Sequence, residues 1–573
     1  MLGAGVAGIT AAHALKKAGM RVKVLEGRGT PGGRVRTEYS HFSYPNAAPQ
    51  SLRGKGIPVD LGGSWIHGVQ GAGNPIFSLS VLAKTPVVKS RWERGVLFKS
   101  DGTRASEAIM IWWLKLMSDV TEFFEEELDD PHVSISEALD DYLNLNNLGK
   151  SDMMTSDMLF PATGDDESVG SSSEESETKS NLSADLADPV SVSKELQRSL
   201  ARIALVIAGE WEWAERMEAL SAKNSFQDGE TLGADVLMPE GYWTIFERTF
   251  MKDLQNDIVY NAEVVKVTQP SGGGGKSSPC SSPHSTASAA SHSNANNSPP
   301  PASGSRSARV ASAPPKLSAS SSSPSLPSIS TINTMSQSYV TVTTADGKQH
   351  LADRVISTLP LGVLKRDVVK FSPAISDHKC VSMARVGYGS MNKIYVQFEE
   401  AFWEPEGEVQ PHVVIWMNDA GTGRLTIGVN HNVLVPHSNI LCILATGEAG
   451  PAVEQMTDER ILDEIMTNLR RCYGPNTPQP CNHMITRWAK DKWSYGSYAS
   501  LVLGSSHDDL RELARPEGRL HFAGEHTATE YLGSVHGAYL SGMRAATEVL
   551  AACNKPAPVS HESFPVDDDL KEA

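Results

Sequence analysis

Three stretches of the chain show the apolar spacing of amphipathic helices. Apolar residues recur every three or four positions from Ala108 to Leu128, from Leu196 to Trp213 and from Asp458 to Tyr473. A period of 3.6 residues places such side chains on one face of a helix. We therefore expect three long helices, each with one face in a core.

A glycine pattern near the start is typical of a nucleotide-binding turn. Gly3, Gly5 and Gly8 form a Gly-x-Gly-x-x-Gly pattern that runs into an expected helix over Val6–Ala18. The first glycine permits a tight turn, the second lets the backbone approach a pyrophosphate, and the third lets the helix pack on a sheet. The free N–H groups at the helix N-terminus favour phosphate. By itself the pattern is weak evidence, because glycine turns occur in many other loops.

An acidic residue at the expected place strengthens this interpretation. Glu26 follows the apolar run Val22–Leu25, at the end of an expected strand, where a carboxylate can accept hydrogen bonds from ribose hydroxyls. Only Met1 and Leu2 precede the first glycine, whereas a strand has typically about five residues. Whether the chain begins late or the natural strand is short, we expect this to reduce stability and cofactor affinity, because the central strand of such a sheet is buried on both faces.

Two stretches have compositions that do not support a packed core. Thr163–Pro189 is rich in Ser, Asp and Glu, and Pro270–Ser338 is rich in Ser, Pro, Gly and Ala. Neither buries enough apolar surface to offset chain entropy, so we expect both to be disordered. The second stretch separates two strand-like runs, Ile258–Thr268 and Tyr339–Thr344, and we interpret it as an expanded tip between two strands. A tolerated surface insertion is favoured over a regulatory role.

Length, charge and cysteine usage narrow the class of protein. A chain of 573 residues is longer than the chains that usually fold around one hydrophobic core, so we expect at least two domains. The net charge of −17 argues against direct nucleic-acid binding and is compatible with cationic small molecules. Six cysteines without metal-ligand spacing predict reduced thiols and no metal site.

The sequence also lacks recognisable membrane and export signals. No segment reaches 18 consecutive apolar residues, no secretory signal is visible, and the chain does not end in a Ser-Lys-Leu tripeptide. We therefore expect an intracellular, cytoplasmic protein without a membrane span. A peroxisomal or nuclear location and the oligomeric state are left open.

Glycine-rich segments elsewhere suit contact with the same kind of ligand. Arg28 is followed by Pro31–Thr37, in which two glycines precede Arg34, a side chain that can neutralise diphosphate. Val59–Gly68 is a strand that runs into a glycine-rich turn.

A similar segment lies near the other end of the chain. Leu520–Thr527 is an expected strand that ends in a Gly-Glu pair, and Tyr531–Gly542 leads into an expected helix over Met543–Ala552. This arrangement suits ribityl and diphosphate oxygens.

Together these motifs resemble the flavin-containing amine oxidase family, and most closely its polyamine and spermine oxidases. The resemblance covers nearly all of the chain outside the two inserts and the tail. It is also carried by Met238–Tyr242, Ser357–Leu364, Gly389–Ile394 and Trp488–Tyr498. It implies FAD and an α/β fold, with a Rossmann-like FAD-binding domain interleaved with a sheet-and-helix, α+β substrate domain.

The resemblance also implies a division of the chain and a set of cofactor contacts. The FAD-binding domain is expected over residues 1–70, 235–370 and 485–553, the substrate-binding domain over 71–234 and 371–484, and a tail over 554–573. Ser497 stands where the monoamine oxidase branch has a cysteine bonded to the flavin, so we expect non-covalent FAD. The expected cofactor contacts are Gly3, Gly5, Gly8, Glu26, Arg28, Gly33, Arg34, Gly62, Gly63, Ser64, Trp65, Val265, Trp488, Gly524, Glu525, Gly533, Ser534 and Val535.

Four residues match catalytic positions of the family. Lys393 matches a lysine that approaches flavin N5 through a water, and burial there favours its neutral form; the alternative is a snorkelling lysine at a strand end. Tyr498 and Tyr531 match two rings that stack the substrate amine, although both could be core tyrosines. His67 resembles a histidine that faces the substrate tunnel in the polyamine oxidase branch, with a structural histidine as the equal alternative.

The residues that hold the distal amines of a substrate are less defined. Glu210 and Glu212 flank Trp211 on an expected helix and are candidates, and an exposed helix face explains them equally well.

The motif set predicts an FAD-dependent amine oxidase that acts on a polyamine or related secondary amine. The expected products are an imine, which hydrolyses to an aldehyde and a shorter amine, and hydrogen peroxide from O2. One alternative is a histone lysine demethylase-like oxidase, although the extra helical domains of that class are not visible. Another is a catalytically inactive flavoprotein that serves as a binding module.

Overall fold

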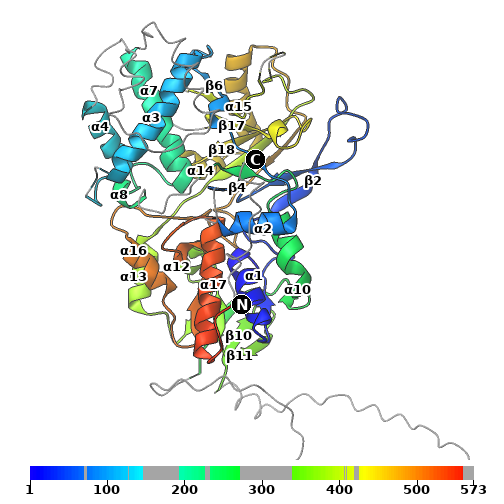
Figure 1. Ribbon diagram of the computed structural model, residues 1–573, viewed down its shortest axis with the longest axis vertical. Coiled ribbons are helices and arrows are strands. Elements are labelled where there is room, and N and C mark those ends of the chain that lie inside the picture. Colours follow the sequence, from blue (N-terminus) through cyan, green and yellow to red (C-terminus); the bar gives the residue numbers. More distant parts are fainter. Residues whose placement is uncertain are drawn as a thin grey trace, which may run out of the picture.

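The computed structural model describes residues 1–69, 74–126, 128, 130–145, 193–225, 233–270, 338–404, 407, 409–417 and 425–558 (Figure 1). The sequence predicts disorder for Thr163–Pro189 and Pro270–Ser338. Both stretches lie outside the described residues, except for Pro270 and Ser338 themselves. Within the described residues no helix is long and apolar enough to cross a membrane.

A parallel sheet is centred on the residue before the first glycine. Leu2 forms parallel bridges to β1 (Val24–Leu25) on one side and to β12 (Val355–Ser357) on the other. β8 (Ile258–Val259) extends the sheet beyond β1, and β21 (Leu520–Phe522) extends it beyond β12. The central strand is thus reduced to one bridged and fully buried residue. The predicted effect of this short strand on stability stays a prediction.

Two helices pack together against this sheet. α1 (Val6–Lys17) contacts α17 (Val535–Ala552) along a seam of alanines, which permit close approach. The predicted start of the second helix at Met543 is wrong by eight residues. Ser534 caps it, because its Oγ accepts a hydrogen bond from the Gly537 N–H at 2.9 Å and so begins the helix at Val535.

A second sheet confirms the interpretation of the Ser/Pro-rich insert. β9 (Val264–Thr268) and β10 (Val340–Thr344), which flank that insert, pair as antiparallel neighbours. The sheet is completed by β11 (Gln349–Ala352) beside β10 and by β13 (Lys370–Ser372) beside β9. The run predicted as one strand over Ile258–Thr268 is divided between β8 and β9.

A six-stranded sheet forms the core of the upper half in Figure 1. Every neighbouring pair is antiparallel except the last, which is parallel. α15 (Asp458–Tyr473), which has the predicted bounds, and α14 (Ala449–Gln455) contribute to the apolar cluster on this sheet. The strand order is β19 (Asn482–Ile485), β15 (Asn392–Gln397), β18 (Ile440–Ala445), β17 (Ile427–Asn430), β16 (Val413–Trp416) and β6 (Gly95–Phe98).

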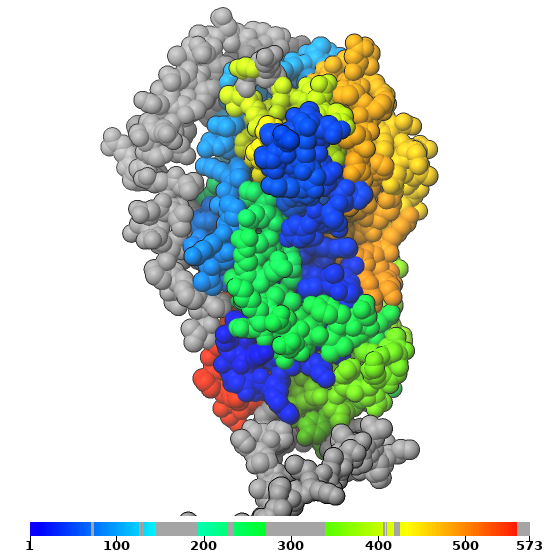
Figure 2. Space-filling view, turned by 90° about the vertical axis from the view of Figure 1, so that its right-hand side faces the viewer, coloured from blue at the N-terminus to red at the C-terminus, as the bar shows by residue number. Residues whose placement is uncertain are grey.

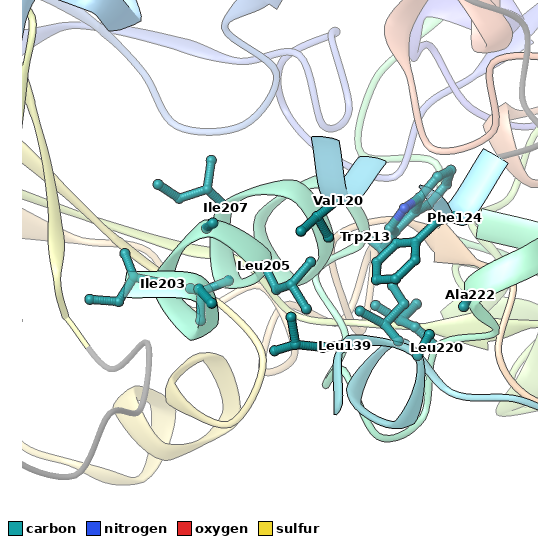
Figure 3. Close-up of a cluster of buried hydrophobic side chains, with 14 of the residues drawn as sticks. Val120, Phe124, Leu139, Ile203, Leu205, Ile207, Trp213, Leu220 and Ala222 are labelled. Atoms are coloured by element: carbon teal, nitrogen blue, oxygen red, sulfur yellow. The ribbon is translucent and has the colours of Figure 1, made fainter. Parts of the chain in front are cut away.

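Three helices share a second apolar cluster (Figure 3). They are α3 (Glu107–Glu126), α4 (Ile135–Leu145) and α7 (Lys194–Leu205). The helix predicted over Leu196–Trp213 is present, but its final part is a π-helix, η2 (Val206–Trp211). In a π-helix each hydrogen bond spans one more residue than in an α-helix, and such turns occur often at functional sites.

Shorter elements join the two main sheets. Residues 233–270 lie beside the first hundred residues on the face shown in Figure 2, where β7 (Val236–Leu237) pairs with β4 (Trp65–Ile66) and β5 (Val88–Lys89). The mixture of parallel and antiparallel sheets covered by helices confirms the predicted fold class. The other short elements are β2 (Thr37–Ser43), β3 (Gly56–Asp60), α2 (Pro75–Ala83), η1 (Trp92–Arg94), α8 (Ala222–Ser225), α9 (Trp243–Phe246), η3 (Glu247–Met251), α10 (Lys252–Leu254), α12 (Leu361–Lys365), α13 (Asp377–Arg385), β14 (Gly387–Tyr388), η4 (His431–Val433), β20 (Ala499–Ser500), α16 (His507–Ala514) and η5 (Glu525–Thr527).

Candidate active site

The first glycine turn is shaped by contacts that leave no room for side chains. Gly3 has φ +101°, and a Cβ added to Gly8 would lie 2.1 Å from the Gly3 carbonyl oxygen. Gly5 is the N-cap of α1, and its lack of a side chain leaves the first N–H groups of the helix without a side-chain cap. Those N–H groups and the positive end of the helix dipole are therefore available for an anion.

Glu26 lies at the end of β1, next to this turn. Its carboxylate accepts hydrogen bonds from the Ala4 N–H at 2.6 Å and the Arg28 N–H at 2.8 Å. Burial nevertheless raises the pKa of this carboxyl group, with the two N–H donors opposing the shift. The Arg28 guanidinium pairs with Asp491 from the far end of the chain. Both residues thus lie beside the glycine turn and line the cavity next to it.

The glycine-rich segment around Arg34 is hydrogen-bonded directly to the segment around Glu525. Arg34 Nη1 donates to Glu525 Oε1 at 2.6 Å and to the Ser497 carbonyl at 2.8 Å. The nearby charge of Glu525 contributes to the raised pKa of the guanidinium, although burial opposes it. Arg34 therefore brings together two segments that are almost 500 positions apart, and Glu525 already balances part of the positive charge expected to face a diphosphate.

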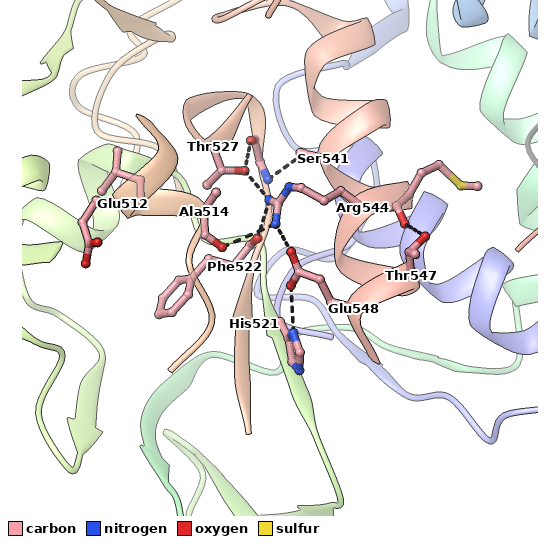
Figure 4. A network of polar contacts seen from close by, with 12 residues as sticks. Glu512, Ala514, His521, Phe522, Thr527, Ser541, Arg544, Thr547 and Glu548 are labelled. Atoms are coloured by element: carbon pink, nitrogen blue, oxygen red, sulfur yellow. Dashed lines mark hydrogen bonds and ion pairs between the residues drawn. The ribbon is translucent and has the colours of Figure 1, made fainter. Parts of the chain in front are cut away.

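A polar network holds the turn that carries Glu525 (Figure 4). From α17, Arg544 donates to the Phe522 carbonyl at 2.8 Å and to Thr527 Oγ1 at 3.0 Å. Ser541, on the same helix, accepts from the Gly524 N–H at 2.9 Å. Because these bonds fix both sides of the turn to one helix, they position Glu525 towards Arg34.

One cavity of about 530 Å³ connects these segments. Three expected site residues do not line it, namely Gly8, Val265 and Tyr531. Val264 lines the wall in place of Val265, because side chains alternate between the two faces of a strand. The expected residues that do line it are Gly3, Gly5, Glu26, Arg28, Gly33, Arg34, Gly62, Gly63, Ser64, Trp65, His67, Lys393, Trp488, Tyr498, Gly524, Glu525, Gly533, Ser534 and Val535.

Lys393 lies on β15 at the cavity wall and is 3% exposed. Its Nζ donates to the carbonyls of Asp60 and Gly62, at 3.0 and 2.7 Å, and to Ser64 Oγ. An ammonium has three donors, so all three are used by protein oxygens in this arrangement. Burial lowers the pKa of Lys393, with the nearby Cys442 and Asp60 opposing the shift. Burial thus disfavours the charged form of Lys393, whereas the three acceptor oxygens match the three N–H donors of an ammonium and support it.

The structure does not pair Tyr498 with Tyr531 across the cavity. The Tyr498 ring lines it, and its hydroxyl donates to the Trp211 carbonyl at 2.7 Å. The Tyr531 ring instead packs against His536, with the ring centroids 4.4 Å apart and the ring planes tilted by 57°. The backbone of Tyr531 has φ +60°, and Ser534, three residues later, reaches the cavity in its place. The expected two-tyrosine cage is therefore reduced to one ring.

The end of the cavity opposite the glycine turn is aromatic and acidic. Trp211 meets both Trp65 and Trp92 edge to face, with ring centroids 5.6 Å and 4.8 Å away, respectively. Glu212 and Asp235 line the same part of the wall. Indole faces and carboxylates both attract cations, so this end suits an ammonium group.

The π-helix separates the two glutamates that the sequence could not distinguish. Glu212 lines the cavity, whereas Glu210 does not. The Glu210 carboxylate packs against Gly447, where an added Cβ would lie 2.2 Å from its Oε2. Burial raises the pKa of Glu210 to about 7, and the nearby carboxylates of Glu218 and Glu448 add to the shift. Glu210 is thus a buried structural carboxyl group, and of the two only Glu212 is placed to meet a ligand.

Several cavity residues were not predicted from the sequence. Asp235, Trp92, Met117 and Ile207 all line the wall. The first two lie in short segments without periodicity or motif, and the last two occupy apolar helix positions that are typical of an ordinary core. No signal in the sequence distinguished them.

The residues at this site fit FAD. The cavity runs from a glycine turn whose third glycine has no room for a Cβ, past Glu26, to a second glycine turn at Gly524 and on to Lys393. A lining of glycine turns, an acidic residue and apolar side chains is suited to a dinucleotide. Within the described residues no cluster of His, Cys, Asp and Glu has the arrangement of a metal site.

Comparison with known proteins agrees with this geometry. The chain matches the family of flavin containing amine oxidoreductases over residues 6–290 and 328–550. It is 26% identical to polyamine oxidase 4 of Oryza sativa subsp. japonica over 96% of this chain and 87% of that protein. It is 37% identical to a possible lysine-specific histone demethylase 1 of Drosophila melanogaster, over 35% of this chain and 24% of that protein.

A solved structure shows the same fold. Wild-type putrescine oxidase bound to putrescine superposes with a TM-score of 0.58 at 18% identity, over 96% of this chain and 98% of that one. The predicted family, cofactor and enzyme class are thus confirmed. With its cradle for FAD and a family match over most of its length, the chain belongs to the flavin-containing amine oxidoreductases.

Proposed function

We propose that the protein oxidises a polyamine or a related secondary amine and passes the electrons to O2, forming hydrogen peroxide. The observation that carries this proposal is the single cavity that joins the FAD cradle and Lys393 to an end lined by three tryptophans and two carboxylates. Asp235 is held by His67 and the Gly68 N–H, so Glu212 is the carboxylate that a second amine of a polyamine would meet. The polyamine oxidases among the relatives support the same substrate class.

In this proposal the chain's own residues position the amine. When bound, the flavin accepts a hydride equivalent from the carbon next to the amine nitrogen. Tyr498 provides one aromatic wall for that nitrogen, held by its bond to the Trp211 carbonyl. Lys393, at the cavity wall, donates to a water beside the reacting carbon when that water replaces one of its three protein acceptors. That water attacks the imine and gives an aldehyde and a shorter amine.

A distal ammonium of the substrate is bound at the acidic end. Glu212 provides the charge, and Trp65, Trp92 and Trp211 provide faces and edges that exclude water. A cation over an indole face in a desolvated site is worth about 2 kcal/mol. We propose that this energy selects substrates with a second amine.

We further propose the domain division expected from the sequence, with FAD bound by residues 1–70, 235–370 and 485–553 and substrate contacts supplied largely by 71–234 and 371–484. Non-covalent attachment of the flavin is supported by Ser497. Its Oγ accepts from the Met391 N–H at 2.8 Å and donates to the Met391 carbonyl at 3.0 Å, and serine cannot form a thioether.

A second candidate is demethylation of a methylated lysine. It is favoured by the relatives that are histone demethylases, one of which is 26% identical over 97% of this chain and 58% of its own length. A methyl-lysine also carries a secondary amine, and it could use the same aromatic walls.

The experiment that tests both candidates is anaerobic titration of the purified flavoprotein. We expect spermine or spermidine to bleach the flavin absorbance, and O2 to restore it with stoichiometric hydrogen peroxide. The Glu212→Gln variant should raise KM for spermidine at least about tenfold, as loss of a charged hydrogen-bonding partner does, while leaving flavin content unchanged. Bleaching by a methyl-lysine peptide but by no polyamine would favour the second candidate. Failure of every amine to bleach bound flavin would overturn both.

A further inference from the structure

His67 is held by a carboxylate from a distant part of the chain. Asp235 Oδ2 lies 3.0 Å from His67 Nδ1, and Asp235 Oδ1 accepts from the Gly68 N–H at 3.1 Å. One carboxylate thus binds both the ring and the peptide that follows it. Both side chains line the cavity and are about one-third exposed there.

The main chain of His67 is fixed independently of its ring. Asn74, the N-cap of α2, donates from Nδ2 to the His67 carbonyl at 2.6 Å and accepts from the Ile76 N–H at 2.9 Å. The backbone position of His67 is therefore set by α2. The orientation of the ring is set by Asp235.

Three ionisable groups face the His67 ring. Asp235 and Glu212 are carboxylates, and both raise the pKa of His67, which reaches about 9 although burial opposes them. The third group, His536, is buried, and its pKa is lowered to about 3 by burial and by the nearby His67. At neutral pH the cavity end therefore holds one imidazolium and two carboxylates. An imidazolium donates from both nitrogens, so with Nδ1 on Asp235 the Nε2–H remains for another acceptor.

We propose that Asp235 is a positioning residue for His67, which it holds so that Nε2 presents an N–H donor to the bound substrate. This inference rests on the proposed amine oxidation. The two carboxylates and the imidazolium together leave one negative charge, which balances one ammonium. The donor fits an uncharged acceptor beside that ammonium, such as the lone pair of a neutral amine nitrogen. The site thus accepts an amine with one charged and one neutral nitrogen. The neutral nitrogen is the one that reacts, because a carbon can lose a hydride only when the nitrogen next to it is uncharged.

The test is the pH profile of kcat/KM for spermidine in a double-mutant cycle. In the wild-type holoenzyme we expect a loss of kcat/KM as His67 loses its proton near a pH of about 9. Asp235→Asn keeps the size of the side chain and removes its charge. The pH at which kcat/KM falls should therefore be lower than in the wild type by about one to two pH units. At a pH of about 8.5 this lowers kcat/KM by about tenfold relative to wild type, with a smaller change at about 6.5. His67→Gln should remove the part of this loss that belongs to the enzyme and leave only the titration of the spermidine amines, which is common to all variants.

The double variant distinguishes positioning from a general structural role. If Asp235 acts through His67, Asp235→Asn has no further effect on kcat/KM in the His67→Gln background. Asp235→Glu, which keeps the charge, should restore an inflection close to the wild-type one. Flavin absorbance and the thermal midpoint of each variant show whether it is folded.

The outcomes separate this inference from the proposed function. A wild-type protein whose flavin no amine bleaches overturns the proposed function. A wild-type protein that is bleached, with Asp235→Asn showing the wild-type pH profile or an additive loss in the double variant, overturns the positioning role. If Asp235→Asn does not fold, an unchanged alkaline inflection in His67→Gln overturns it instead.

Discussion

Replacing Glu210 with glutamine should stabilise the protein, and more so as the pH rises. Glu210 is 7% exposed in the π-helix, and burial is the largest cause of its raised pKa. The carboxylates of Glu215, Glu218 and Glu448 lie close enough to raise that pKa further. Glutamine has the same shape, carries no charge and keeps an acceptor oxygen.

The sign and size of the effect follow from proton linkage. The pKa of Glu210 is about 7 in the folded protein and 4.5 ordinarily. The folded state therefore holds this proton more tightly, and stability falls as the pH rises from 4.5 through about 7. At a pH of about 8 the difference of about 2.5 units corresponds to a cost of about 3 kcal/mol, and at a pH of about 5.5 to about 1 kcal/mol. Glu210→Gln removes this cost.

The assay is the thermal midpoint of the holoenzyme between pH values of about 5.5 and about 8, the range over which the linkage cost grows. Unfolding entropy is about 2 cal/mol/K per residue, so in a chain of 573 residues a gain of about 3 kcal/mol raises the midpoint by about 3 °C at the alkaline end. Glu400→Gln is the matched control, because its exposed side chain lies outside the cavity and should change stability by less than about 0.5 kcal/mol. The reasoning would be refuted if Glu210→Gln and the wild type had the same thermal midpoint at the alkaline end. It would also be refuted if the difference between their midpoints did not increase with pH.

Three further predictions concern the cofactor and the lysine. Gly8→Ala places a Cβ 2.1 Å from the Gly3 carbonyl oxygen, so flavin content per protein, measured by absorbance, should fall to less than about a tenth of the wild-type value; a fully loaded variant would contradict this. Lys393→Met keeps the length of the side chain and removes its nitrogen, and it should slow the release of the aldehyde by about 100-fold or more at unchanged flavin content, while anaerobic flavin reduction is affected less; a wild-type rate of aldehyde formation in rapid-quench experiments would exclude the proposed role. Arg544→Met leaves the Phe522 carbonyl without its donor, so the Kd for FAD should rise about tenfold, with Thr547→Val on the exposed side of the same helix as the control.

Some parts of this molecule are determined by short stretches of sequence. The glycine turn at Gly3–Gly8 is one, because the positive φ of Gly3 and the clash of a Cβ at Gly8 with the Gly3 carbonyl oxygen both arise within the turn itself. α15 is another, since the apolar period that predicted its bounds is local, and so are the Thr457 and Gly474 caps that the structure shows at its two ends. The insert between β9 and β10 was predictable for the same reason, because strand propensity on both sides is local.

The tertiary structure decided which side chains share the cavity. Glu210 and Glu212 flank the same tryptophan, and only the π-turn, which depends on packing around η2, directs one to the core and the other to the cavity. Tyr531 has a plausible spacing, yet a backbone with φ +60° and contact with His536 leave Ser534 at the wall. The contact of Asp235 with His67 crosses 168 positions. Backbone requirements are short-ranged and can be read from sequence, whereas the direction of a side chain depends on what packs against it, and that is fixed only when distant segments meet.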